Sequence, residues 1–191
     1  MPNHITKYIV NKGDQKKIDE LLEKVKFNKS NNANELQFDF NSLIPMPEEL
    51  GQTKSPVEIV ATQEEADSTN SKHIPNEWNS NKYQVISQAE HDRRLNEYGA
   101  DNWYDWSLKH WGTKWNAYEA FFMGEDENEV ALVFQTAWSF PEPIFKAIEE
   151  QYGLEVHCKW IDEGGWDGEY GDPEESFYIH TEINVEYEGA R

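Results

Sequence analysis

The sequence predicts an α+β fold in which helices cover one face of a mainly antiparallel sheet. Short runs in which apolar and polar residues alternate are typical of half-buried strands. Segments with apolar residues at spacings of three and four are typical of amphipathic helices. Along the 191 residues these segments follow the order β-α-β, helical insertion, β-β-α-β and a last strand. This order favours helices gathered on one side of a single sheet.

The first part of the chain predicts a β-α-β unit. Residues 4–10 are predicted to form a short strand, and Asp14 is the expected N-cap of the following helix. The apolar stripe of that helix consists of Ile18, Leu21, Leu22 and Val25. Leu36, Phe38 and Phe40 alternate with polar residues, which predicts a second, half-buried strand.

A polar insertion is expected next, at about residues 51–114 of a single domain covering 1–191. The two prolines of residues 43–47 exclude a central strand or a helix there, so we expect an extended segment. Residues 51–81 are predicted to be loop-like and mobile, with a short helix near 57–65.

Two helices are predicted after this loop. Ser87 and Glu90 form a capping-box pattern, and Gly99 ends the helix that they begin. The second helix covers residues 102–111 and ends at Gly112. The stretch around it holds four of the eight tryptophans: Trp103, Trp106, Trp111 and Trp115. Two interpretations stay open, a core in which this helix turns onto the sheet, or a platform for a ligand or partner.

A central hairpin is predicted in the second half of the chain. Residues 114–123 and 130–138 are its strands, and residues 124–128 are its acidic turn. One face of the second strand consists of Val130, Leu132, Phe134, Thr136 and Trp138. Because Ala131 and Val133 are apolar on the other face, we expect the hairpin to be buried on much of both sides.

The last elements complete the pattern. Ser139 and Glu142 form a second capping-box pattern, and Gly153 is expected to end that helix. Strands are predicted at residues 154–160 and 177–187. The complete order is that of the split β-α-β, ferredoxin-like topology, a name that concerns topology only.

The chain is strongly acidic, and the acid is concentrated near its C-terminus. The net charge is 17 − 37 = −20, and residues 125–191 hold 18 acidic residues against three basic ones. Such a surface disfavours direct binding of nucleic acid or of anionic membranes and favours partners with a basic surface. Solubility alone is the competing explanation. The acidic surface candidates are Asp162, Asp167, Glu169, Asp172, Glu174 and Glu175.

The sequence shows no constellation for catalysis, metal binding or cofactor binding. The single cysteine, Cys158, excludes an internal disulfide and a cysteine-based zinc site. No two histidines lie three or four residues apart, and residues 162–172 lack the spacing of a calcium loop. We therefore interpret residues 162–172 as a hairpin turn or bulge. Because neither a signal-peptide pattern nor an apolar run of 18 residues is present, we expect a cytoplasmic protein.

Several segments together carry a family resemblance. They are residues 1–3, 40–50, 103–107, 111–118 (W-G-T-K-W-N-A-Y), 134–143 (F-Q-T-A-W-S-F-P-E-P) and 163–168. The sequence resembles the YubB-like, or Api-type, proteins of phages and plasmids, which have a ferredoxin-like domain. The resemblance implies a mobile-element origin in bacteria and carries over no catalytic residues. Cys-x-Asn, expected after residues 1–3, is missing, and residues 51–81 look individual to this chain.

Three functions follow from these features. The first is a non-enzymatic binding protein that acts on a host protein, in its concrete form an inhibitor of a nucleic-acid-binding host defence system. The alternative is a small-ligand or nucleotide-binding module that uses the tryptophan-rich segment. The third is an enzyme of unrecognised type, with Lys114, Asn116 and Glu163 meeting at the end of the sheet. Candidate ligand- or partner-binding residues are Trp106, Trp111, Lys114, Trp115, Asn116, Trp138, Glu163 and Trp166.

Overall fold

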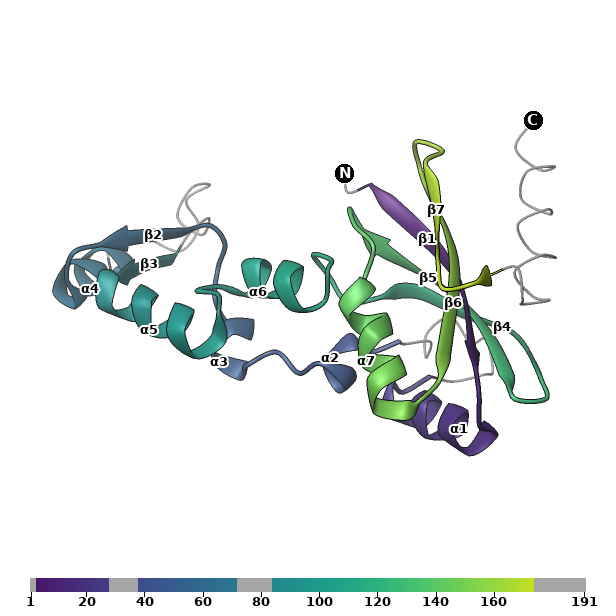
Figure 1. Ribbon diagram of the computed structural model, residues 1–191. Helices are drawn as coiled ribbons and strands as arrows, with labels where there is room; N and C mark the ends of the chain where they lie inside the picture. Colours follow the sequence, from purple (N-terminus) through teal and green to yellow (C-terminus); the bar gives the residue numbers. More distant parts are fainter. Residues whose placement is uncertain (1–2, 28–37, 72–83, 174–191) are drawn as a thin grey trace. The chain divides into compact units, whose positions relative to one another are not determined.

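The computed structural model describes residues 3–27, 38–71 and 84–173 (Figure 1). The chain divides into two compact units. The first, here called the sheet unit, consists of residues 1–45 and 111–191. The second, the inserted unit, consists of residues 46–110. In the described parts of the chain, no helix is long and apolar enough to cross a membrane.

The sheet unit is built on a five-stranded sheet with the order β4-β5-β1-β6-β7 (Figure 1). Its strands are β1 (His4–Lys12), β4 (Tyr118–Asp126), β5 (Glu129–Ala137), β6 (Glu155–Asp162) and β7 (Asp167–Tyr170). Every pairing between neighbours is antiparallel. The first strand of the chain therefore lies at the centre of the sheet. This arrangement confirms the predicted α+β, ferredoxin-like fold.

Two helices cover one face of this sheet, α1 (Gln15–Lys24) and α7 (Glu142–Tyr152) (Figure 1). Asp14 caps α1, because its side chain accepts a hydrogen bond from the Lys17 backbone, and the predicted apolar stripe is buried. Gly153 ends α7 with φ 66°, as predicted. The core between helices and sheet includes Phe134, which lies edge-on to Phe145 at 6.4 Å.

The second strand of the β-α-β unit is not where the sequence predicts it. Asp39 caps a short helix, α2 (Phe40–Leu43), so the strand prediction is wrong at Phe38 and Phe40; Leu36 lies outside the described residues. Both rings are fully buried, and Phe38 stacks on Phe134 at 4.9 Å. The apolar-polar alternation at this point has another cause: the rings of Phe38 and Phe40 both enter the core, and Asp39 between them caps α2. The strand that completes the split β-α-β is β4, which follows the inserted unit in sequence.

The inserted unit has secondary structure where a loop was predicted. It contains α3 (Glu48–Gly51), β2 (Val57–Val60), α4 (Gln63–Ser71), β3 (Gln84–Ser87), α5 (Gln88–Tyr98) and α6 (Trp103–His110). Strands β2 and β3 pair in parallel. The short helix predicted near 57–65 is wrong over residues 57–60, which form β2, and α4 begins only at Gln63. The loop prediction is wrong over residues 66–71, where the polar composition of α4 hid the helical pattern. The predicted caps of α5 are confirmed, since Ser87 accepts from the Glu90 backbone and Gly99 has φ 74°.

Three further predictions in the sheet unit need correction. Residues 114–117 precede β4 rather than belonging to it, and β4 continues to Asp126, so the turn is shorter than predicted. Trp138 leaves the face of β5 with φ 70°. Ser139 does not cap α7, because its hydroxyl donates to the Gly112 carbonyl and the N-cap is Pro141. The strand predicted at 177–187 lies outside the described residues. The hairpin turn predicted for residues 162–172 is present at 163–166, between β6 and β7, and residues 167–170 form β7 itself.

Candidate binding site

One end of the sheet brings together four of the predicted site residues. Trp138 follows the end of β5, Asp162 is the last residue of β6, and Glu163 and Trp166 lie in the turn between β6 and β7. Asn3 connects the two groups, since its carbonyl accepts from the Trp138 backbone at 2.8 Å and its amide donates to Asp162 at 3.0 Å. The other oxygen of Asp162 accepts from the Trp166 backbone at 2.8 Å. A continuous chain of hydrogen bonds therefore holds the two tryptophans at the same end of the sheet.

Trp138 is held in a backbone conformation that bulky residues avoid. Its φ of 70° is left-handed, and its side chain is 56% exposed. The neighbouring backbone is fixed on both sides, because Thr113 Oγ1 donates to the Ala137 carbonyl at 2.8 Å and Thr136 Oγ1 donates to the Ser139 carbonyl at 2.7 Å. Such a conformation costs about 1–3 kcal/mol and persists only where the surroundings impose it. The surroundings of Trp138 thus impose a backbone that leaves its indole in solvent.

Trp166 is the most exposed large apolar side chain in the described part of the chain, at 76%. It forms two backbone contacts with Asp162, since the Asp162 N–H also donates to the Trp166 carbonyl at 2.9 Å. The hydrogen bonds from Asn3 and from the Trp166 backbone hold the pKa of the Asp162 carboxyl below its usual value. The Asp162 carboxyl is therefore ionised over the physiological pH range, and its hydrogen bonds stabilise this turn.

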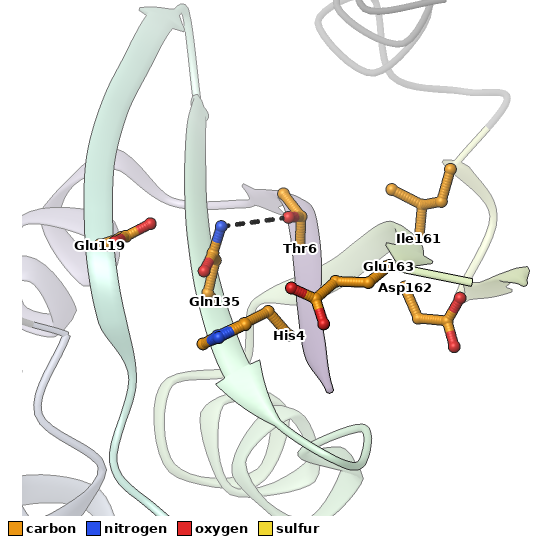
Figure 2. A pocket seen from close by; sticks show the side chains of 7 residues that line it. All are labelled: His4, Thr6, Glu119, Gln135, Ile161, Asp162 and Glu163. Carbon is orange, nitrogen blue, oxygen red and sulfur yellow. Dashed lines mark hydrogen bonds between the residues drawn. The ribbon is translucent and has the colours of Figure 1, made fainter. Parts of the chain in front are cut away.

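A hollow of about 340 Å³ opens on the sheet face beside these residues (Figure 2). Its lining residues are His4, Thr6, Glu119, Gln135, Ile161, Asp162 and Glu163. The strand register explains the set, because Thr6 lies opposite both Gln135 and Ile161. Side chains on one face of adjacent strands come together in this way even when they are far apart in sequence.

The floor of the hollow is hydrogen-bonded. His4 Nδ1 lies 2.6 Å from the hydroxyl of Tyr118. Burial, with the negative charges of Glu119 and Glu163, raises the pKa of Tyr118 to about 12. The phenol therefore keeps its proton at physiological pH. Gln135 Nε2 donates to Thr6 Oγ1 at 3.5 Å.

The walls of the hollow are acidic. Glu119 and Glu163 are exposed, and within the described residues neither forms an ion pair with a lysine or arginine. None of the lining residues is a lysine or an arginine. The described ranges hold no group of three residues that could bind a metal ion. The acidic side chains that line the hollow are Glu119, Asp162 and Glu163.

Other predicted residues are part of the packed interior. Trp106, in the inserted unit, is 4% exposed and stacks on His110 at 4.5 Å. Trp111, in the sheet unit, is 7% exposed, and its indole N–H donates to the Ile44 carbonyl at 2.8 Å. Asn116 accepts from the Phe40 and Ala117 backbones and donates to Asp39. Within the sheet unit, Trp111 and Asn116 organise the packing around α2.

The predicted meeting of Lys114, Asn116 and Glu163 does not occur in the hollow, which Glu163 lines without the other two. Lys114 instead lies 4.7 Å from the ring of Trp115, in cation–π geometry. Among the acidic candidates, Asp167, Glu169 and Asp172 are exposed on or after β7. Glu174 and Glu175 lie outside the described residues.

Sequence reasoning missed His4, Thr6, Glu119 and Gln135. Thr6 and Gln135 are polar residues that alternate with buried ones along β1 and β5, which is the available signal for an outward face. That signal cannot pair one strand with another, so the hollow stays invisible until the register is known.

The fold and the comparisons define the same class, a protein with a ferredoxin-like domain. Residues 110–189, less than half of the chain, match the family model described as the ferredoxin-like domain in Api92-like protein. No curated protein and no solved structure matches the chain. The matched part includes β4 to β7, whereas the central strand β1 comes from residues before it. The match supports the resemblance to Api-type proteins over this part of the chain.

Proposed function

We propose that this chain is a non-enzymatic binding protein that acts on a host protein with a basic surface. The observation that carries the proposal is the end of the sheet where Trp138 and Trp166 are exposed beside the carboxylates of the hollow. Hydrogen bonds through Asn3 and Asp162 hold both backbones in place before any partner arrives. Preorganised tryptophans of this kind are typical centres of protein interfaces.

The exposed indoles could supply much of the affinity. A buried aromatic side chain removes 150–250 Å² from water. From the exposed fractions of 56% and 76%, covering both rings removes about 260 Å², which contributes about 6 kcal/mol before the costs of association. Two tryptophans therefore provide enough free energy for a specific complex when the surrounding contacts are complementary.

The charge selects the partner class. A net charge of −20 attracts basic surfaces, speeds their association and repels phosphate backbones. In its concrete form, the partner is a nucleic-acid-binding protein of a bacterial host defence system, inhibited when this chain covers its basic surface. The proposal of a host defence partner rests on the resemblance to phage- and plasmid-encoded proteins. It implies that the chain acts in the cytoplasm of the bacterial host.

The nucleotide-binding alternative has less support from the geometry. Trp106 and Trp111 are buried, and Lys114 lies over the ring of Trp115. Stacking a base on Trp115 would compete with this cation. A thermal-shift screen of the full chain with nucleotides tests the alternative, which requires stabilisation that Trp115→Ala abolishes.

The proposal is tested by capture and then by direct binding. The tagged chain is incubated with bacterial lysate at low and high salt, and captured proteins are identified by mass spectrometry. We expect a basic protein at low salt and less of it at high salt. The purified partner is then titrated by calorimetry against Trp138→Ala, Trp166→Ala and a control, Trp115→Ala. Unchanged affinity in the first two variants, or binding indifferent to salt, would refute the proposed surface.

A further inference from the structure

The geometry points to a more specific role for the hollow: it receives an arginine side chain of the partner. This inference rests on the proposed function, because the hollow lies at the same end of the sheet as Trp138 and Trp166. It assigns the chemical class of the group that enters, a guanidinium, and the residues that hold it.

The carboxylates stand on opposite sides of the hollow. Figure 2 shows Glu119 on β4 at one side and Glu163, after β6, at the other, with Gln135 and Thr6 between them. A cation lying over Gln135 would face both carboxylates at once. Without a cation, the two carboxylates face the same open hollow.

The floor supplies hydrogen-bond acceptors. The Gln135 amide donates to Thr6, which leaves its carbonyl oxygen free to accept. His4 Nδ1 is already occupied, because it is hydrogen-bonded to the Tyr118 hydroxyl at 2.6 Å.

The arrangement favours guanidinium over ammonium. A guanidinium is planar, has five donors and pairs with carboxylates in two directions at once. An ammonium is a compact and strongly hydrated charge, so it would satisfy one wall and leave the other unpaired. The apolar stem of an arginine would pass over Ile161 and toward the exposed indoles at this end of the sheet.

The test uses small probes, so it does not need the partner. Nα-acetyl-L-argininamide and Nα-acetyl-L-lysinamide are titrated into the full chain, and the ring signals of His4 are followed by NMR. We expect saturable shifts with the arginine probe and several-fold weaker binding of the lysine probe. The double variant Glu119→Gln/Glu163→Gln removes two partly exposed ion pairs with the arginine probe. We therefore expect it to bind this probe about tenfold more weakly.

A control variant separates the hollow from general acidity. Glu127→Gln/Glu150→Gln removes the same charge from exposed positions outside the hollow, in the β4–β5 turn and in α7. Equal loss in both double variants, or equal affinity for the two probes, would overturn the inference. The amide spectrum of each variant shows whether it has kept the fold.

The inference and the proposed function can fail separately. If the arginine probe binds as expected but the lysate provides no basic partner, the proposed function is refuted and the assignment of the hollow as a guanidinium site is retained. If a captured partner depends on Trp138 and Trp166 but binds Glu119→Gln/Glu163→Gln as tightly as the control, the arginine assignment is refuted and the proposed function stands.

Discussion

Lys7 is a fully buried lysine at the centre of the sheet, and it should make the stability of the protein depend on pH. Its side chain has no exposed surface and lies on the face covered by α1 and α7. The ammonium group donates to the Ile5 carbonyl at 2.7 Å and also to Thr136 Oγ1. Burial lowers the pKa of Lys7 to about 7, opposed only in part by Cys158.

The direction in which stability changes with pH follows from the number of protons that the folded and unfolded states bind. In the unfolded chain Lys7 has its ordinary pKa of about 10.4. Between pH 7 and that value the unfolded state holds a proton that the folded state has released, so stability rises with pH. Between pH 6 and pH 9 the gain is about 3 kcal/mol, from 1.36 kcal/mol per pH unit.

The perturbation is Lys7→Met, which keeps the shape of the stem and removes the titrating group. Urea denaturation of both proteins at pH 6 and pH 9, followed by tryptophan fluorescence, gives the free energies of unfolding. We expect the pH-dependent gain in the parent to exceed that in the variant by about 3 kcal/mol. Since other groups titrate equally in both proteins, a difference below about 1 kcal/mol would refute a neutral buried Lys7.

Three further predictions concern other parts of the sheet unit. Asn11 is buried, and both polar atoms of its side-chain amide lack a hydrogen-bond partner. Asn11→Leu should therefore raise the free energy of unfolding, measured by urea denaturation, by about 1–3 kcal/mol. A lower free energy of unfolding in the variant would show that the amide is satisfied. Gly171→Ala should lower the melting temperature more than Gly153→Ala does. Both glycines have positive φ, but only at Gly171 would the new Cβ collide with the Val156 carbonyl. Equal melting temperatures of the two variants would contradict this. Cys158 is fully buried and burial raises its pKa, so a thiol reagent should label it only after unfolding, and rapid labelling of the native chain would contradict the packing.

Helix ends were predictable from the sequence because they depend on neighbouring residues. Asp14, Ser87, Gly99 and Gly153 all cap their helices as their sequence positions indicate. Ser139 shows the limit of this reasoning. It stands in the same pattern as Ser87, but the Gly112 carbonyl, 27 residues away, takes its hydroxyl. A local pattern predicts a cap only when no distant group competes for the same side chain.

Alternation was informative for strands that pair inside the sheet and misleading elsewhere. It located β1, β5 and β6, whose partners are also alternating strands. At Phe38 and Phe40 the same spacing belongs to a turn into a short helix, because both rings enter the core. Burial of alternate residues is a property of the packing around them, and a strand is one of several backbones that achieve it.

The sequence by itself determined the fold class, the main helix boundaries and the acidic charge. These properties depend on local periodicity, capping chemistry and composition. Only the tertiary structure decided that Trp106 and Trp111 are interior while Trp138 is exposed, and that residues of four strands or their ends line one hollow. The physical reason is strand register: a shift by one residue would turn every outward side chain inward, and register is determined by the whole sheet and not by any one strand.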